Sequence, residues 1–188
     1  EKAGLVPQVL EIESLAVARA LVPQGVSLVL ILLVDLGATR TSFLVFAGHS
    51  LRFTASLPVA SHQFTEAISK ALGVNSPKAE ELKKTYGLER RGKSEGGQVF
   101  EALLPHMVSL VEQMKKYMEY YVSHATHQHL PEEERTIQKV LLAGGGANLP
   151  GLSVFLESEL NTKVSIGDPW VNIAQKPSAK LPPLPFGE

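Results

Sequence analysis

A short stretch after the most apolar run of the chain has residue types that suit phosphate and metal binding. It reads Asp35-Leu-Gly37-Ala38-Thr39-Arg-Thr41. Gly37, Ala38 and Thr39 are small enough for backbone N–H groups to approach phosphate oxygens closely. An aspartate at a strand end beside such a turn suits Mg²⁺, which usually keeps its waters and bridges to phosphates. The alternative is a plain hairpin turn in which Asp35 accepts hydrogen bonds from nearby N–H groups.

A second stretch is rich in glycine and lies between an apolar run and a helical pattern. Gly144, Gly145 and Gly146 follow Val140-Leu-Leu-Ala. Without side chains they would let a flat ring lie against the backbone. No Lys-Ser/Thr pair follows, so this is not a P-loop. The alternative is a tight strand–helix connection with no ligand.

The third stretch carries charges at helical spacing. Glu80 and Lys83 lie three residues apart and therefore project from one helical face. A carboxylate and an ammonium there could contact ribose hydroxyls and a purine edge. The alternative is a solvated charged face.

Three histidines about two thirds of the way along the chain resemble a metal cluster. These are His124, His127 and His129. They follow a helical pattern and precede a loop, without a carboxylate fixed nearby, so the sequence does not favour a metal there.

The elements that position these stretches include several short strands. Val26–Val34 is the most apolar run of the chain but is far shorter than the roughly 20 residues of a membrane span, so we expect a strand buried on both faces. The expected strands are 28–35, 41–47 and 51–57, which form a meander, followed by 137–143 and 164–166. A further short strand is expected in VPQVLEI, residues 6–12.

Helical periodicity and punctuation predict the helices. We expect Ser14 to cap a helix that ends before Pro23, and Ser76 to cap a helix that ends at Gly87. The other expected helices are 61–72, a long amphipathic one over 99–121, and 150–159. Pro105 is expected to kink the long helix or to mark its first turn. Charged or polar loops are expected at 89–97 and 130–135.

Composition excludes several classes of function. The 188 residues carry a formal net charge of −1, which disfavours a nucleic-acid binder driven by phosphate neutralisation. The chain has no cysteine, which excludes a disulfide scaffold, a thiolate metal site and a cysteine nucleophile.

Along the chain the aspartate stretch comes first, the helix with Glu80 and Lys83 second, and the glycine stretch last. This order resembles the second half of the actin-like ATPases, the superfamily of actin, sugar kinases and Hsp70. The resemblance is closer to the PilM family of type IV pilus assembly, with the FtsA cell-division proteins as near relatives. The segments that carry this resemblance are AGLVPQVLEIESLAVARAL, LLVDLGATRTSFLVF, FTEAISKALGVNSPKAEELKKTYGL and VLLAGGGANLPGLSVFLESELNTKVSIGDPW.

The resemblance implies an α/β fold, an actin-like (ribonuclease H-like) lobe with a mixed sheet flanked by helices and an inserted, mainly helical subdomain. It implies that ATP and Mg²⁺ bind. By position, the phosphate loop would be Asp35, Gly37, Ala38, Thr39 and Thr41, with Asp35 near the Mg²⁺. Glu80 and Lys83 would meet the ribose and adenine, and Gly144, Gly145 and Gly146 the adenosine. Arg40 departs from the glycine-rich version of this loop, and either holds phosphate or points to solvent.

The resemblance also implies a division of the chain. Residues 1–24 would end the first lobe, 25–58 and 137–174 would form the nucleotide-binding core, 59–136 the inserted subdomain, and 175–188 a truncated proline-rich tail. The first phosphate loop of the family has no counterpart here, so we expect a fragment cut at both ends.

For the partners, the resemblance implies a cytoplasmic scaffold that is peripheral to the inner membrane through other pilus platform proteins. A PilN-like cytoplasmic peptide would bind mostly through the absent first lobe, and ATP hydrolysis would be slow at most. No nucleic acid and no direct membrane insertion are expected. The alternatives are an FtsA-like protein that anchors the division ring, and an actin-fold kinase of a small molecule.

Overall fold

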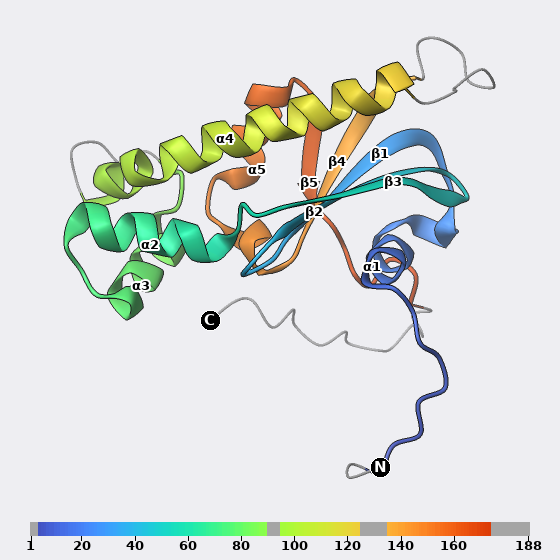
Figure 1. The fold of residues 1–188 in the computed structure, drawn as a ribbon, viewed down its shortest axis with the longest axis horizontal. Coiled ribbons are helices and arrows are strands. Elements are labelled where there is room, and N and C mark those ends of the chain that lie inside the picture. The colour runs from blue at the N-terminus through green and yellow to red at the C-terminus, as the bar shows by residue number, and fades with distance from the viewer. Residues whose placement is uncertain (1–3, 90–94, 125–134, 174–188) are drawn as a thin grey trace, which may run out of the picture.

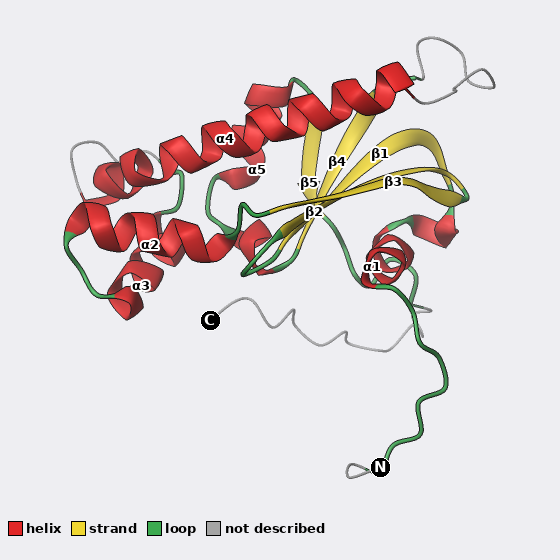
Figure 2. Cartoon of the chain, viewed as in Figure 1, coloured by secondary structure: helices red, strands yellow, loops and turns green. Residues whose placement is uncertain are grey.

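The computed structural model describes residues 4–89, 95–124 and 135–173. Its centre is a five-stranded mixed sheet with the order β3-β2-β1-β4-β5 (Figure 2). The strands are β1 (Ser27–Leu36), β2 (Thr41–Gly48), β3 (Ser50–Leu57), β4 (Ile137–Ala143) and β5 (Lys163–Ile166). β1 to β3 form the expected antiparallel meander, whereas β4 pairs parallel to both β1 and β5.

The central strand β1 is buried on both faces, as its apolar run predicts. Alternate side chains point to opposite faces of a strand. Leu30, Leu32, Val34 and Leu36 belong to one hydrophobic core, whereas Ile31 and Leu33 belong to a second, smaller one.

Helices cover the two faces of the sheet and one of its ends. They are α1 (Glu13–Leu21), α2 (Ser61–Leu72), α3 (Ser76–Tyr86), α4 (Glu95–His124) and α5 (Leu152–Leu160), with short 3₁₀ turns at Pro23–Gly25 and Gly145–Asn148. The long α4 crosses one face, α1 lies against the other, and α2 and α3 extend beyond one end of the sheet (Figure 1). The larger core joins α2, α3, α4 and α5 to the sheet, and the smaller core joins α1 to it.

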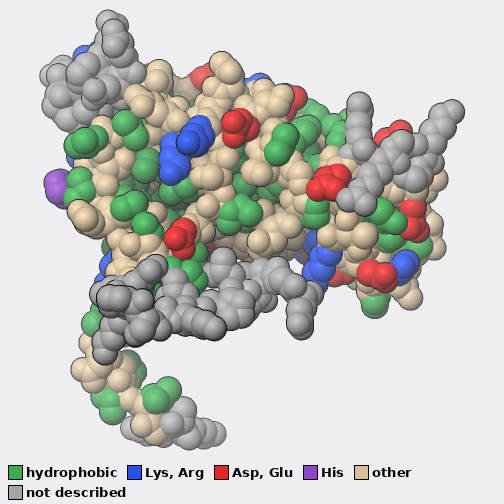
Figure 3. Space-filling view, turned by 180° about the vertical axis from the view of Figure 1, so that it is seen from behind, with side chains coloured by type: hydrophobic (Ala, Val, Ile, Leu, Met, Phe, Trp, Pro, Cys, Tyr) green, Lys and Arg blue, Asp and Glu red, His purple; other side chains and the backbone are tan. Residues whose placement is uncertain are grey.

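The strand expected at residues 6–12 is absent: residues 4–12 have no regular structure. This segment projects from the body with apolar side chains along it (Figure 3), and Leu10 is 92% exposed. A strand needs a neighbour to pair with its N–H and C=O groups. No other strand in the described part of the chain lies beside this one, so the apolar pattern alone does not make it a strand.

Two of the expected helix caps are wrong. α1 begins at Glu13 after Ile12, without a side-chain cap, so Ser14 lies inside the helix. α3 is capped by Asn75, whose Oδ1 accepts a hydrogen bond from the N–H of Lys78 at 3.0 Å. Asn75 has the extended backbone that a cap requires, and Ser76 is already helical.

The starts of two helices also differ from the expected residues 99 and 150. α4 begins at Glu95 and includes Gly96 and Gly97, and Pro105 lies inside it. Gly96 is buried, and packing outweighs its weak helix propensity. α5 begins at Leu152 because Gly151, with φ of +78°, takes a non-helical conformation. The remaining loop residues 90–94 and 130–134, and the tail 175–188, lie outside the described residues.

Candidate functional site

The aspartate turn and the glycine turn lie side by side because they follow neighbouring parallel strands. Asp35 at the end of β1 is in register with Ala143 at the end of β4. The two turns therefore leave the sheet at the same edge, which is the usual place for ligands in sheets with parallel strands.

The three glycines of the turn differ in whether the structure leaves room for a side chain at their positions. A Cβ on Gly144, whose φ is +79°, would lie 2.4 Å from Asp35 Oδ1 and 2.6 Å from the Leu36 oxygen. A Cβ on Gly146 would lie 2.6 Å from Leu36 Cδ2, whereas one on Gly145 would meet nothing within 4 Å. Close packing against β1 thus requires glycine at positions 144 and 146, and only position 145 has room for a side chain.

The turn after β1 is held by the start of α2. The N–H of Gly37 donates to the Arg40 oxygen at 3.0 Å. The N–H groups of Ser61 and His62 donate to the carbonyls of Gly37 and Ala38, each at 3.1 Å. These bonds fix the turn and leave the N–H groups of Ala38 and Thr39 for another acceptor.

Ala38 and Thr39 carry those N–H groups at the exposed tip of the turn. Neither N–H donates a hydrogen bond to any residue that the structure describes. The buried Thr41 is different, because its hydroxyl donates to the Val59 carbonyl at 2.6 Å. The tip is therefore open to an anion, whereas the Thr41 hydroxyl is already engaged.

Asp35 is half-buried on the face of the sheet that α1 covers. Its pKa is raised above the ordinary value, first by burial and then by the Glu13 carboxylate, while the Arg40 guanidinium opposes this rise. Arg40 forms an ion pair with Glu13, so in this structure it binds α1 instead of pointing freely to solvent. Among the described residues none donates a hydrogen bond to the Asp35 carboxylate, which disfavours the plain hairpin interpretation.

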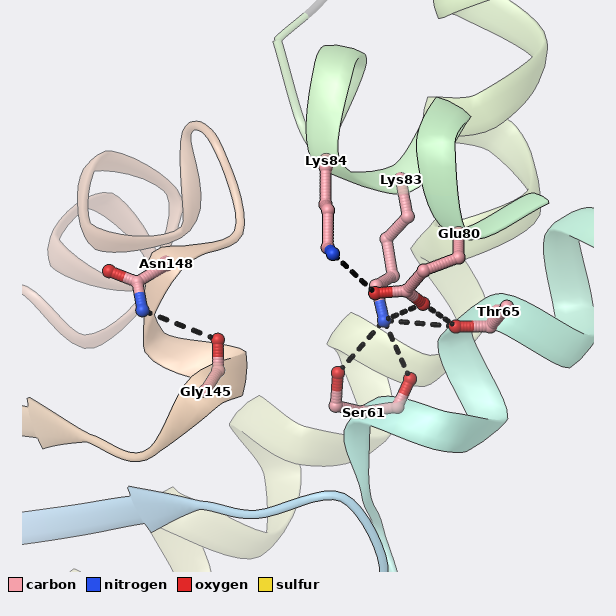
Figure 4. Close-up of polar contacts among 7 residues, drawn as sticks. All are labelled: Ser61, Thr65, Glu80, Lys83, Lys84, Gly145 and Asn148. Carbon is pink, nitrogen blue, oxygen red and sulfur yellow. Dashed lines mark hydrogen bonds and ion pairs between the residues drawn. The ribbon is translucent and has the colours of Figure 1, made fainter. Parts of the chain in front are cut away.

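Glu80 and Lys83 share a face of α3, as their spacing predicts (Figure 4). The Lys83 side chain is only 9% exposed and its Nζ lies 2.7 Å from Glu80 Oε2, so this lysine is not part of a solvated face. Burial of Glu80 raises its pKa, but hydrogen bonds from Lys83 and Thr65 and the charges of Lys83 and Lys84 outweigh burial and lower the pKa overall.

The end of α3 is fixed to the segment that follows the glycine turn. The N–H of Leu88 donates to the Pro150 oxygen at 2.8 Å. A Cβ on Gly87 would lie 2.4 Å from that same oxygen. In Figure 4, Glu80 and Lys84 lie across a gap from Gly145 and Asn148, so the charged helix and the glycine turn face one another.

Four residues of this arrangement were missed by sequence reasoning. Ser61, Thr65, Lys84 and Asn148 surround the predicted pair and the glycine turn (Figure 4). Ser61 and Thr65 lie four residues apart at the start of α2, a spacing that places two hydroxyls on one face and could have indicated a polar cluster.

The described ranges contain no cluster of side chains typical of a metal site. Across these residues, no group of three His, Cys, Asp or Glu side chains could hold a metal ion. His124 stacks on Tyr120, with ring centroids 4.3 Å apart, and His127 and His129 lie outside the described residues. Within the same ranges, no helix is long and apolar enough to cross a membrane.

The sheet order, the two adjacent turns and the facing helix define the class of protein, the actin-like ATPase fold. MreB5 of Spiroplasma citri, solved bound to ADP, superposes with a TM-score of 0.67 and 15% identity, over 92% of this chain and 59% of that one. The archaeal actin homologue Ta0583 superposes with a TM-score of 0.61 and 17% identity, over 87% of this chain and 51% of that one.

Within this class the sequence matches the family described as "Type IV pilus assembly protein PilM" over residues 1–184, and the chain belongs to that family. A solved PilM–PilN type IV pilus biogenesis complex is similar, with a TM-score of 0.68 and 26% identity, over 89% of this chain and 45% of that chain. The cell-division protein FtsA of Streptococcus pneumoniae is 24% identical over 175 residues, which are 88% of this chain and 38% of that protein. FtsA of Helicobacter pylori is 39% identical over 54 residues, 29% of this chain and 11% of that protein. The chain thus spans less than half the length of these relatives.

Proposed function

We propose that this chain forms one wall of an ATP and Mg²⁺ site in a PilM-type scaffold protein. The observation that carries the proposal is the meeting of three features at one edge of the sheet. These are the open N–H groups of Ala38 and Thr39, the exposed backbone of Gly145, and the Glu80 carboxylate on the facing helix.

The residues have distinct roles in this proposal. Ala38 and Thr39 bind phosphate oxygens through their N–H groups, supported by Gly37 and Thr41. Asp35 holds Mg²⁺ through its waters, and the cation offsets the cost of a partly buried carboxylate near Glu13. Mg²⁺ supplies charge neutralisation for the phosphates when bound.

The nucleoside lies between Gly145 and α3 in this proposal. Glu80 keeps 38% of its side chain exposed and accepts hydrogen bonds from the ribose hydroxyls. Gly144 and Gly146 keep the turn close to β1, so that the open position of Gly145 faces the ligand.

A binding measurement tests the nucleotide proposal. In the full-length protein, we expect calorimetry to detect Mg²⁺-dependent ATP binding that Asp35→Asn weakens at least about tenfold, the loss of one charged contact. Glu112→Gln, at an exposed position of α4, is the control. Equal affinity with and without Mg²⁺, or unchanged affinity in Asp35→Asn, would contradict the proposed metal role.

The family points to a scaffold role in type IV pilus assembly. We infer a cytoplasmic protein, peripheral to the inner membrane through its partners, that binds a PilN-like cytoplasmic peptide; hydrolysis of ATP is slow at most. Most of that peptide groove belongs to the first lobe. Full-length protein should bind the N-terminal cytoplasmic peptide of the PilN-like protein from the same organism and should not bind a scrambled peptide.

The similarity to FtsA supports a second candidate, a cell-division scaffold. Fluorescent full-length protein distinguishes the two roles in cells. Foci that depend on the PilN-like protein support the pilus role, whereas a midcell ring that persists without it supports the division role.

A further inference from the structure

Lys83 is a buried ammonium whose hydrogen bonds are all made within the protein. Its Nζ lies 2.7 Å from Glu80 Oε2, 2.9 Å from Thr65 Oγ1, 3.0 Å from Ser61 Oγ and 3.3 Å from the Ser61 carbonyl oxygen (Figure 4). An ammonium has three N–H donors. These acceptors use all of them, so none remains for a ligand.

The acceptors of Lys83 connect two parts of the site. Ser61 is the first residue of α2, and its N–H donates to the Gly37 oxygen in the aspartate turn. Thr65, one helical turn later, accepts from Lys83 and donates its own proton to Glu80 Oε2 at 2.6 Å. A continuous path of polar contacts therefore runs from the aspartate turn through Ser61 and Lys83 to Glu80.

Glu80 is held in this path by one oxygen only. Oε2 accepts hydrogen bonds from both Lys83 and Thr65, whereas the nearest charged partner of Oε1 is Lys84 at 3.8 Å. The network thus fixes the plane of the carboxylate and leaves Oε1 on the side that faces Gly145 and Asn148 (Figure 4).

We propose that Lys83 is a positioning residue that does not itself contact the nucleotide. It orients Glu80 toward the ribose and ties that carboxylate, through Ser61, to the turn that holds the phosphates. This inference rests on the proposed nucleotide site and adds a specific division of labour between the two charged residues.

A double-mutant cycle on nucleotide affinity tests the inference. In the full-length protein, the affinities for Mg²⁺-ATP and Mg²⁺-2′,3′-dideoxy-ATP are measured for Glu80→Gln, Lys83→Met and the double variant. The wild type should bind ATP about tenfold more tightly than dideoxy-ATP, as expected for hydrogen bonds from the ribose hydroxyls to a charged group. Each single variant should lose most of this preference, and the double variant should lose no more than either one.

The same helix offers a matched control pair. Lys78 and Glu81 are also three residues apart and form an ion pair at 3.1 Å on the exposed side of α3. Lys78→Met, Glu81→Gln and their double variant should keep the full preference for ATP. This control separates the positioning role from a general effect of charge on α3.

A second variant covers the case in which Lys83→Met does not fold. Thr65→Val keeps the shape of the side chain but removes its hydrogen bonds to Lys83 and Glu80, and it should also lose the preference for ATP. A fold defect alone would lower the melting temperature, but it would not make the affinities for ATP and dideoxy-ATP equal.

Several outcomes would overturn the inference. If Glu80→Gln and Lys83→Met each lowered the preference for ATP by its own factor, and the double variant lowered it by the product of the two factors, Lys83 would contact the sugar directly. Retained preference in Lys83→Met or Thr65→Val, or no preference in the wild type, would refute the positioning role while ATP binding stands. A wild type that binds no ATP would refute the proposed function together with the inference.

Discussion

Asp35 combines a partly buried carboxylate with a nearby glutamate, and this raises its pKa. The folded protein therefore holds the proton of Asp35 more tightly than the unfolded chain does. As pH rises from the ordinary aspartate value of 3.8 through the folded-state value, ionisation costs folding stability, and the cost is complete above both values. A binding site can keep such a residue because the ligand needs it.

We expect Asp35→Asn to raise the melting temperature of the ligand-free protein at pH 7. The rise should be at most about 4 °C, which corresponds to about 1 kcal/mol in a domain of this size. It should shrink as the pH falls toward 3.8. Thermal unfolding followed by circular dichroism measures it, with Asp168→Asn as control because Asp168 is exposed and its Oδ1 accepts the Trp170 N–H. A lower melting temperature at pH 7 would show that the carboxylate stabilises the fold.

Gly144 and Gly145 should respond differently to alanine. Gly144→Ala places a methyl group 2.4 Å from Asp35 Oδ1 at a φ of +79° and should destabilise the protein by at least about 1–3 kcal/mol. Gly145→Ala meets open space and should change stability by less than about 1 kcal/mol. Urea unfolding of both variants compares them directly, and equal effects would contradict the distinction.

The candidate site could be predicted in part from residue types and order. The aspartate turn, the Glu80–Lys83 pair and the glycine turn stand in the sequence as local patterns. Burial of Lys83 could not be predicted from them, since it depends on Ser61 and Thr65 of another helix. The packing of Gly144 against Asp35 likewise depends on the parallel pairing of β1 with β4.

At the scale of elements, apolar runs and periodicity predicted most strands and helices, because burial dominates their formation. The errors fall at the ends, where one or two local contacts decide. Asn75, not Ser76, caps α3, since it has the extended backbone and reaches the Lys78 N–H. Residues 6–12 have an apolar pattern typical of a strand, but a strand also needs a partner, which a pattern cannot supply.

The correct cap of α3 can be tested by two neighbouring substitutions. Asn75→Ala removes the acceptor for the Lys78 N–H and should cost about 1 kcal/mol. Ser76→Ala, one residue later and inside the helix, should change stability by less than about 0.5 kcal/mol. Chemical denaturation gives both values; a larger cost for Ser76→Ala would restore the serine as the cap.

At the scale of the whole molecule, one side chain near the C-terminal end of the described residues contacts the end of α1. The Asn172 amide donates to the carbonyls of Arg19 and Val22, each at 2.7 Å. Its Oδ1 accepts from the Gln24 N–H, also at 2.7 Å. Asn172 thus caps the end of α1 from the far end of the sequence, a contact that no local pattern predicts.

We expect Asn172→Ala to loosen α1 from the sheet. The loss of three hydrogen bonds should cost about 1–3 kcal/mol and should speed amide hydrogen exchange in α1 relative to α5. Asn172→Asp keeps the acceptor for Gln24 and loses both donors, so its effect should be at least as large, because the new charge faces two carbonyls. Unchanged exchange in α1 would mean that the smaller core alone holds this helix.

The pairing of β1 with β4 has a consequence for how the chain folds. The two strands are neighbours in space but lie on either side of α2, α3 and α4 in the sequence. Contacts between distant parts of a chain form slowly, because a long loop must close first. During synthesis the β1–β3 meander emerges early, and the second edge of β1 stays unpaired until β4 arrives, open to strands of other chains. The glycine turn reaches the aspartate turn only when β4 pairs with β1. The time at which ligand affinity appears during refolding would therefore report when this last pairing forms.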